Sequence, residues 1–213
     1  MKVRTYEKIE TVFERDTEGS KKLKEGIFRN PTVRMLQNVP WEWTEKIDGT
    51  NIRVCWDGHS VSFGGRTDSA SIPAPLVNRL NELFGGETNA QIFEQKFGEN
   101  EVILFGEGYG AKIQKGGGLY KSDGVDFILF DVLIRNTYLT RDSVSDIARC
   151  FGVQAVPVIM RGPIFAAVEY VKSKPMSTIG TAPMEGLVGR PMEELFDRLG
   201  NRLILKIKVR DFE

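Results

Sequence analysis

The stretch WTEKIDGTNIRV, residues 43–54, places a lysine between two acidic residues, just before a glycine at which the backbone can turn. Alternation along a strand would put Lys46 and Asp48 on one face and Ile47 on the other, while Gly49 permits a turn or the close approach of a ligand. A surface pair of this kind is common before a hairpin turn and contributes about 0–1 kcal/mol. The stretch alone therefore leaves a structural and a functional interpretation open.

The composition is that of an ordinary soluble protein. Of 213 residues, 41% are hydrophobic and 27% are charged, and the formal net charge is +0. A global positive field for nucleic-acid binding is absent, and no apolar run approaches the roughly 20 residues of a membrane span. We expect an intracellular, cytoplasmic protein without a membrane partner, folded as a single domain over residues 1–213, in which residues 1–40 form an N-terminal segment of short helix and loops.

The residues that bind soft metals or serve as catalytic bases are few. Cys55 and Cys150 each adjoin an apolar residue, which favours buried free thiols over a disulfide. With His59 they make three soft ligands, too few for a structural zinc site, and a Ser-His or Cys-His pair would have to include His59. No GK[ST] sequence of a P-loop and no HRD or DFG sequence of a kinase is present.

Alternating apolar and polar residues predict a mixture of strands and helices. Three short β-like runs separated by DGT and DGH turns predict an antiparallel meander over residues 41–65, which two helices at 73–84 and 88–97 would cover. Further strands are expected at 101–108, 125–134, 185–190 and 202–212, and further helices at 140–152 and 162–173. The predicted class is α+β.

Charged residues interrupt several of the apolar strands. They are Glu107, Asp131, Glu185, Lys206 and Lys208. A buried charge is unfavourable unless it is paired or bound to an ion, so this recurrence favours a functional site. The two lysines are two residues apart and would share one face of their strand, with Leu205 and Ile207 facing the core. Two adjacent ammonium groups indicate a site for an anion.

In this order the motifs resemble those of the covalent nucleotidyltransferases, which comprise ATP-dependent DNA ligases, RNA ligases and mRNA capping enzymes. The first is a KxDG motif at residues 46–49, and the others are FGE at 105–107, Phe130 with Asp131, EGLV at 185–188 and KIK at 206–208. Each motif alone is weak, but together they are specific and span Lys46 to Lys208. The resemblance implies a nucleotidyltransferase domain whose antiparallel sheets line a nucleotide cleft with flanking helices.

Within this group the chain is most similar to RNA ligases of the phage nick-sealing type. Asn51 stands five residues after the lysine, where DNA ligases and capping enzymes usually carry arginine. Arg66 stands where the family has an arginine that binds the end being joined. Asp48 departs from the histidine common in the phage enzymes and is typical of DNA ligases, so the preferred polynucleotide stays open. The sequence ends five residues after Lys208, so no C-terminal OB-fold or accessory domain is expected; a separate protein supplying one, and a phage origin, stay open.

The resemblance implies an ATP-dependent reaction in which Lys46 forms a lysyl-AMP, the AMP passes to an RNA 5′-phosphate, and a 3′-hydroxyl displaces it, as in RNA repair. A free lysine titrates near 10.4, and Asp48 alone would favour its charged form, so cations must offset the acids. The implied catalytic residues are Lys46, Asp48, Glu107, Glu185, Lys206 and Lys208. The nucleotide or phosphates would contact Glu45, Lys46, Gly49, Asn51, Arg66, Glu107, Phe130, Glu185, Lys206 and Lys208. Mg²⁺ or Mn²⁺ would bind Glu107, Asp131 and Glu185.

Three other functions are consistent with the same motifs. They are a DNA nick ligase, a GTP-dependent guanylyltransferase of the capping type, and a non-catalytic relative that binds a nucleotide or RNA. Covalent labelling separates them, because a ligase would attach AMP to Lys46, a capping-type enzyme would attach GMP, and a binding module would attach neither.

Overall fold

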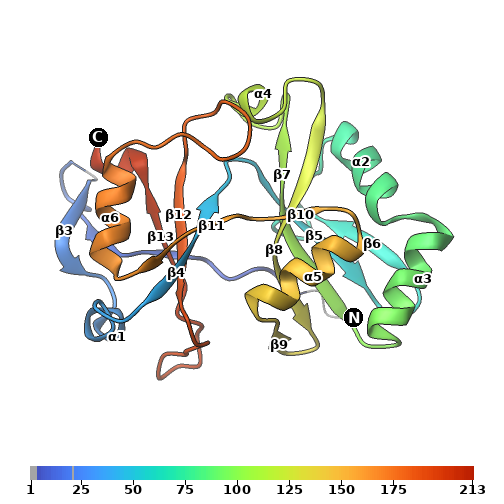
Figure 1. Ribbon diagram of the computed structural model, residues 1–213, viewed down its shortest axis with the longest axis horizontal. Coiled ribbons are helices and arrows are strands. Elements are labelled where there is room, and N and C mark those ends of the chain that lie inside the picture. The colour runs from blue at the N-terminus through green and yellow to red at the C-terminus, as the bar shows by residue number, and fades with distance from the viewer. Residues whose placement is uncertain (1–3, 21) are drawn as a thin grey trace. The chain divides into compact units, whose positions relative to one another are not determined.

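The strands of the protein lie in two main sheets, each with its own hydrophobic core. The computed structural model describes residues 4–20 and 22–213 (Figure 1). The chain divides into two compact units. Unit 1 comprises the N-terminal residues up to Glu7 together with Asp48–Val156, and unit 2 comprises Lys8–Ile47 and Pro157–Glu213. The predicted α+β class is confirmed, whereas the predicted single domain stays a prediction.

Unit 1 is built on a mostly antiparallel sheet in the order β10-β8-β7-β5-β6, with β9 paired to β8. Only the pairing of β10 with β8 is parallel among these strands of the described chain. The strands are β5 (Thr50–Trp56), β6 (Val61–Gly64), β7 (Val102–Gly110), β8 (Val125–Ile134), β9 (Thr137–Tyr138) and β10 (Gln154–Ala155). The helices are α2 (Ala74–Phe84), α3 (Gly86–Phe97), α4 (Gly117–Tyr120) and α5 (Arg141–Cys150).

One face of this sheet is covered by helices, and the other carries Asn51 and Arg53 beside buried apolar side chains such as Phe105. Ile52, Val54 and Trp56 of β5 enter the core that α2, α3 and α5 cover. In α2 the apolar residues recur at helical spacing, so Leu80 and its neighbours one turn away all reach that core. Burial of each large apolar side chain contributes about 1.5–3 kcal/mol. Because side chains alternate along a strand, the intervening residues Asn51, Arg53 and Cys55 lie on the opposite face.

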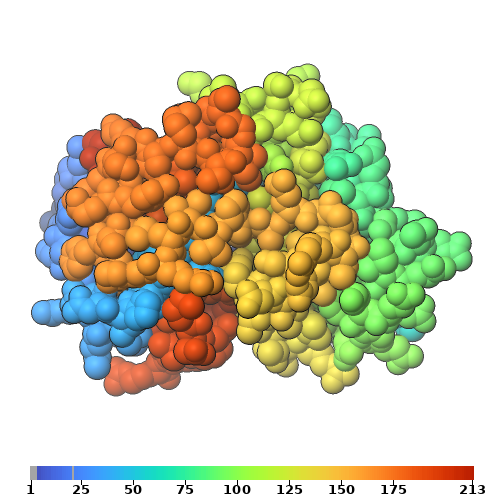
Figure 2. Space-filling view, viewed as in Figure 1, coloured from blue at the N-terminus to red at the C-terminus, as the bar shows by residue number. Residues whose placement is uncertain are grey.

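Unit 2 joins two segments that lie far apart in the sequence. Its main sheet has the order β1-β13-β12-β4-β11, and β2 and β3 form a separate pair. In Figure 2 the blue N-terminal and the orange to red C-terminal residues of this unit lie beside one another. The strands are β1 (Glu10–Thr11), β2 (Phe13–Arg15), β3 (Leu23–Phe28), β4 (Trp41–Lys46), β11 (Val158–Gly162), β12 (Gly186–Pro191) and β13 (Leu205–Lys208). The helical elements are α1 (Pro31–Met35), α6 (Ile164–Lys172) and the 3₁₀ turn η1 (Val209–Phe212).

The core of unit 2 is organised around two tryptophans of β4. Trp41 and Trp43 are fully buried, and their rings stack with centroids 5.9 Å apart. Leu187 of β12 and Ile207 of β13 join them in one cluster, which α6 completes through Val168 and its apolar neighbours. The two buried tryptophans determine which face of β4 is turned toward the core. They thereby also determine the register of the neighbouring strands.

Two predictions about strands are wrong. The meander expected over residues 41–65 does not form, because β4 pairs with β12 and β11, while β5 pairs with β6 and β7. The DGT turn therefore carries the chain from one sheet to another instead of closing a hairpin. The N-terminal segment, expected as short helix and loops, contains β1, β2 and β3 besides α1. Strand β3 is mostly exposed, so no apolar alternation signals it.

The expected free thiols and the helix expected at 140–152 are present. Cys55 and Cys150 are free thiols, and Cys55 is buried. Thr140 caps α5, since its side chain accepts a hydrogen bond from the Ser143 backbone nitrogen. Among the helices in the described ranges, none has the length and apolar character needed to cross a membrane.

Candidate functional site

Three neighbouring strands of unit 2 bring Lys46, Glu185 and Lys208 together. Lys46 is the last residue of β4, and Lys208 is the last residue of β13. Gly186 opens β12 between them and is the register partner of both lysines. Glu185 immediately precedes Gly186, so its carboxylate lies where the two flanking lysines can reach it. Residues separated by as much as 162 positions in the sequence therefore meet through antiparallel pairing alone.

Glu185 is the shared acceptor of this cluster. Its Oε2 lies 2.7 Å from Nζ of Lys46, and its Oε1 lies 2.5 Å from Nζ of Lys208. Burial on its own would raise the pKa of Glu185, but the charge of Lys46 and the hydrogen bonds from both lysines outweigh it, and the pKa is lowered. With all three groups charged, the cluster carries one net positive charge. It combines a candidate nucleophile with the attraction for an anion that the sequence predicts.

Lys206 lies two residues before Lys208, opposite Val188 of β12. Lys206 and Lys208 are half-buried, whereas Leu205 and Ile207 between them are buried. The predicted alternation of β13 is therefore confirmed, and both ammonium groups stand on one side of the strand. The structure brings together Lys46, Glu185 and the two lysines of the KIK motif.

Glu45 has an environment that the sequence did not indicate. It is only 2% exposed, and its carboxylate accepts hydrogen bonds from the backbone nitrogen of Thr178 at 3.0 Å and from the hydroxyls of Ser177 and Thr178. A buried carboxylate that accepts several hydrogen bonds is satisfied within the protein. Glu45 thus ties the loop after α6 to β4, and its predicted contact with the nucleotide stays a prediction. The sequence offers no signal for the two hydroxyl residues.

In unit 1, Gly49 lies against strand β7. A Cβ added to Gly49 would lie 2.3 Å from the carbonyl oxygen of Gly108 and 2.8 Å from Cγ of Glu107, closer than real atoms approach. The glycine is therefore required by the packing of this turn against β7, whatever it does for a ligand. Gln114 donates to the Gly49 carbonyl oxygen at 2.8 Å, and the Asp48 backbone nitrogen donates to the Tyr120 hydroxyl at 3.4 Å.

Asn51 and Glu107 are register partners on β5 and β7. The Asn51 Oδ1 atom is buried and has no hydrogen-bond partner among residues 4–20 and 22–213. Buried polar atoms are almost always paired, so an orphaned acceptor at this position points to a donor that a ligand or ordered water supplies. The structure therefore places three predicted site residues, Gly49, Asn51 and Glu107, at one end of the β5–β7 pair.

Phe130 and Asp131 lie on β8 at an irregularity of the sheet. Asp131 pairs with Phe105 and Leu129 pairs with Gly106, so Phe130 is the extra residue of a β-bulge. Asp131 is 1% exposed, and its Oδ2 accepts a hydrogen bond of 2.8 Å from the Tyr6 hydroxyl. The Tyr6 ring meets Phe130 edge-on, with centroids 5.0 Å apart.

Tyr6 is a residue that sequence reasoning missed. A single aromatic residue in the N-terminal segment, 125 positions from Asp131, gives no signal of the contact. Its hydroxyl occupies one oxygen of the Asp131 carboxylate within unit 1. Asp131 therefore has a structural role, and its predicted role as a metal ligand stays a prediction.

Arg66 lies beyond the end of β6 in an exposed loop. This position keeps its guanidinium accessible, as a residue that grips a polynucleotide end requires. Its predicted role stays a prediction.

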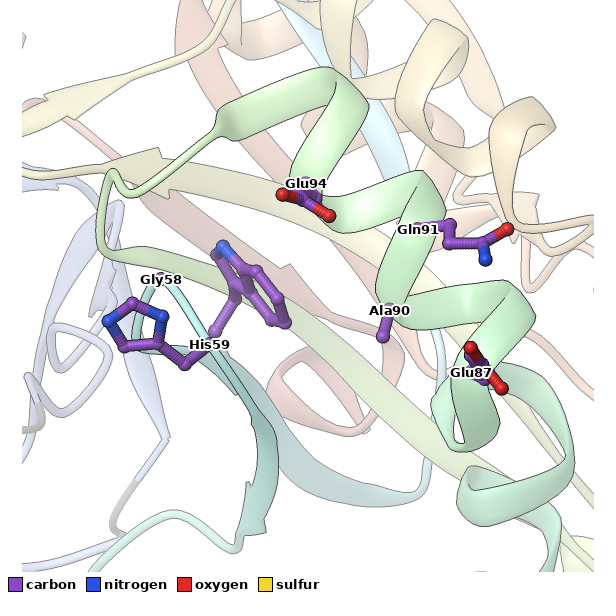
Figure 3. A pocket seen from close by; sticks show the side chains of 7 residues that line it. Gly58, His59, Glu87, Ala90, Gln91 and Glu94 are labelled. Carbon is purple, nitrogen blue, oxygen red and sulfur yellow. The ribbon is translucent and has the colours of Figure 1, made fainter.

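A separate hollow lies at the other end of β5. Its volume is about 320 Å³, and Figure 3 shows Glu87, Ala90, Gln91 and Glu94 on α3, with His59 on the opposite side. The full lining is Trp56, Gly58, His59, Glu87, Ala90, Gln91 and Glu94. None of these is a serine or cysteine, so the one histidine of the chain has no nucleophile to activate in this hollow. It is not part of the candidate site.

The candidate donors fit a hard divalent cation only in part. Glu107 and Glu185 offer carboxylate oxygens, which Mg²⁺ and Mn²⁺ prefer. Within the described part of the chain, however, no group of three or more His, Cys, Asp or Glu side chains gathers into a metal site. Mg²⁺ commonly keeps several waters and binds one or two carboxylates together with substrate phosphates. Either carboxylate taken by itself, Glu107 in unit 1 or Glu185 in unit 2, fits a cation of that kind, which the phosphates of a nucleotide would complete.

Comparison with known proteins identifies the group to which these features belong. A family model described as RNA ligase matches residues 39–208. No curated protein matches the chain with significance. Several RNA ligase structures from Naegleria gruberi resemble it. An apo variant has 21% identity and a TM-score of 0.65, covering 85% of this chain and 53% of that one.

Two further structures from the same organism contain ligands. A variant with ATP and Mn has 23% identity and a TM-score of 0.62, with coverage of 85% and 53%. A structure with PPi has 22% identity and a TM-score of 0.63, with coverage of 97% of this chain and 62% of that one. The present chain thus spans between half and two thirds of the length of the proteins it matches. At this level of identity the likeness establishes the fold.

Proposed function

The chain belongs to the RNA ligase family, and on that premise we propose that it is an ATP-dependent RNA ligase. The proposed reaction begins with transfer of AMP to Lys46. The AMP then passes to an RNA 5′-phosphate, and a 3′-hydroxyl displaces it to form a phosphodiester. The Naegleria gruberi structures that contain ATP with Mn, AMP with Mn, and PPi support this assignment by likeness of fold.

One observation carries the proposal. Lys46 and Lys208 both bind the carboxylate of Glu185, although the three residues come from three separated motifs. A chance resemblance of short motifs would not be expected to bring two ammonium groups within 2.7 Å of the same carboxylate. A surface ion pair also contributes too little stability to explain why three charges are retained at half-buried positions.

The first step forms a bond between Nζ of Lys46 and the α-phosphorus of ATP and breaks the bond from that phosphorus to the leaving pyrophosphate. The amine must lose a proton first, because a free lysine with a pKa near 10.4 is almost wholly charged at neutral pH. Glu185 holds the amine in place. Lys206 and Lys208 are proposed to attract the negative charge that develops on the phosphate.

A divalent cation, Mg²⁺ or Mn²⁺, would neutralise phosphate charge when bound, and Glu107 and Glu185 are the proposed holders. Asp131 is the weakest of the three predicted ligands because Tyr6 and its own strand enclose it. Phe130 is proposed to stack on the adenine, a contact worth about 1–3 kcal/mol for bases on aromatic rings. Asp48 and Asn51 are proposed to orient the nucleotide, and Arg66 is proposed to hold phosphates of the RNA ends.

Incubation of the protein with α-labelled ATP or GTP and magnesium, without polynucleotide, tests the first step. We expect label from ATP only, in a linkage that is stable to base and labile to acid, as a phosphoramidate is. Label from GTP would instead identify a capping-type enzyme. Absence of label from both would leave a binding module.

Nicked duplexes distinguish the polynucleotide. Two substrates that differ only in having RNA or DNA on the 3′-hydroxyl side of the nick should be compared at equal enzyme concentration. We expect faster sealing with RNA at that position. Faster sealing with DNA would identify a DNA nick ligase, the alternative that Asp48 favours. If label forms but neither nick is sealed, a partner protein or domain supplied in trans becomes the next variable to test.

A further inference from the structure

A buried guanidinium lies beneath the loop that carries Arg66. Arg53 occupies the middle of β5 and is only 1% exposed. Its Nε donates to the carbonyl oxygen of Gly65 at 2.7 Å, and its Nη2 donates to Oδ1 of Asp68 at 2.8 Å. Its Nη1 is buried and has no hydrogen-bond partner in the described part of the protein. A buried charge is costly unless it is well paired, so this arginine is a poor choice for stability alone.

The end of β6 is shaped to fit this guanidinium. Gly64 is the register partner of Arg53, and a Cβ added to Gly64 would lie 2.9 Å from Nη2 and 3.3 Å from Cζ. Only a residue without a side chain lets the guanidinium lie across the strand at this point. The two glycines of the FGGR motif therefore have separate functions: Gly64 makes room for the guanidinium, and Gly65 accepts its hydrogen bond.

Both hydrogen-bonded partners of Arg53 belong to the loop, and Arg66 lies between them. Gly65 precedes Arg66 directly, and Asp68 follows two residues later. A backbone hydrogen bond of 3.1 Å from Ala70 to Thr67 closes the rest of the turn. The loop is thus fastened on each side of Arg66 to one rigid group in the sheet. Asp68 itself is 78% exposed at its side chain, so this fastening lies at the surface.

Resting on the proposed function, we propose that Arg53 is a positioning residue that fixes the Arg66 loop for capture of the RNA end. Ordering a loop before binding removes an entropic cost that substrate binding would otherwise have to offset. Arg53 acts through Arg66 in this proposal and does not touch the reacting atoms. The proposal separates sealing, which needs Arg66, from formation of lysyl-AMP, which does not.

The variant Asp68→Ala tests the proposal, because it removes the exposed carboxylate that Arg53 binds. Asp123→Ala is the matched control, since it removes a carboxylate that is 85% exposed from an ion pair with Lys121 in the same unit. We expect Asp68→Ala to leave lysyl-AMP formation within about 2-fold and to lower nick sealing about 10-fold, the equivalent of one lost charged hydrogen bond. Trypsin cleavage after Arg66 in the native protein should become at least about 5-fold faster, because the loop opens more often. The control variant Asp123→Ala should change none of the three rates, which are those of lysyl-AMP formation, nick sealing and trypsin cleavage.

Two further variants complete the test. Arg53→Lys keeps the charge but cannot donate in the planar fork, and it should reproduce the sealing defect and the faster cleavage. The double variant Asp68→Ala with Arg66→Ala should seal no worse than Arg66→Ala alone, because both changes remove the same function. Trypsin cleavage is scored only for the variants that keep Arg66.

Three outcomes would overturn the proposal. They are equal losses of labelling and sealing in Asp68→Ala, an unchanged rate of cleavage after Arg66, and a double variant whose defect multiplies the two single defects. A failure of the proposed function looks different, since the unaltered protein would then form no lysyl-AMP at all. In that event the cleavage rates still decide whether Arg53 holds the loop.

Discussion

The charged cluster of unit 2 and the polar group of unit 1 differ in how completely they are satisfied. In unit 2, each carboxylate oxygen of Glu185 accepts a hydrogen bond from one lysine, Lys46 or Lys208. In unit 1, the Asn51 Oδ1 atom, beside Glu107, is buried and has no hydrogen-bond partner among the residues that the structure describes. One cluster is complete in the absence of a ligand, whereas the other contains an acceptor that lacks its donor.

This difference indicates that the two units contribute differently to the proposed reaction. An ion cluster that is already paired holds a reactive amine in a fixed place, and its net positive charge favours an incoming anion. An unpaired acceptor gains more from a ligand that donates to it, since the cost of burying it has already been met in folding. We therefore assign the chemical step to unit 2 and a larger share of ligand recognition to unit 1.

Replacement of Lys46 gives the largest expected effect. Lys46→Ala removes the proposed nucleophile while Lys208 still pairs with Glu185, so label transfer from ATP should fall by at least about 10³-fold. Lys174→Ala, which removes a lysine that is 64% exposed and paired with Glu213, is the control and should label normally. Circular dichroism should be the same for both variants. Residual labelling of Lys46→Ala above about 10% would place the nucleophile elsewhere.

Replacement of Glu185, the acceptor shared by the two lysines, gives the second-largest expected effect. Glu185→Ala leaves two ammonium groups without their common carboxylate, and label transfer should fall about 10²-fold as the amine loses its fixed position. Glu169→Ala removes a carboxylate that is 70% exposed from an ion pair with Lys172 on α6, and it serves as the control. Labelling rates at saturating ATP measure the effect. A rate within about 3-fold of normal would mean that Lys46 is positioned by other groups.

Replacement of Asn51 tests the role of the unpaired acceptor in unit 1. In Asn51→Ala the orphaned acceptor disappears, so the free energy of unfolding should change by no more than about 0.5 kcal/mol. The affinity for the nucleotide or the rate of sealing should fall about 10-fold, because the ligand loses its acceptor. Urea unfolding and labelling as a function of ATP concentration measure the two effects. A large loss of stability without a functional loss would make Asn51 a structural residue.

The smallest expected effect concerns acid stability. Because the pKa of Glu185 is lowered in the folded protein, the unfolded chain binds more protons between the folded and unfolded pKa values, and stability there rises with pH. The contribution is complete above about pH 4.3, the ordinary value for glutamate, and is lost as the pH falls through the folded value. Urea unfolding should show wild type more stable than Glu185→Gln by about 1 kcal/mol at pH 6, with a smaller difference at pH 3.5. A difference in stability that does not change with pH would contradict this coupling between stability and the pKa of Glu185.

The sequence predicts the local chemistry of this protein better than its long-range pairing. Period-two alternation correctly places Leu205 and Ile207 in the core, with Lys206 and Lys208 on the other face. The order of the motifs predicts the family. It also predicts that Lys46, Glu185 and Lys208 share one site. These successes rest on patterns within a few residues, or on motifs whose order alone is informative.

The remaining features depend on contacts between distant residues. Strand β4 looks like the start of a hairpin, yet its partners β11 and β12 lie more than a hundred residues away. The hydrogen bonds of Glu45 with Thr178 and of Asp131 with Tyr6 likewise join residues far apart in sequence. Arg53 offers the one signal that could have been used, since an arginine inside the apolar run NIRVCW requires a buried partner.

The order in which the strands leave the ribosome has a consequence for this chain. Strand β4, which carries Lys46, is synthesised before its neighbour β11, and β12 and β13, which complete the ion cluster, follow only after residue 185. Most of unit 1, in contrast, is one continuous segment that can pair as it emerges. Non-local pairing is slow because loop closure precedes any gain from contacts. A nascent chain would therefore hold Lys46 without its ion-pair partner Glu185 until β12 and β13 have been made.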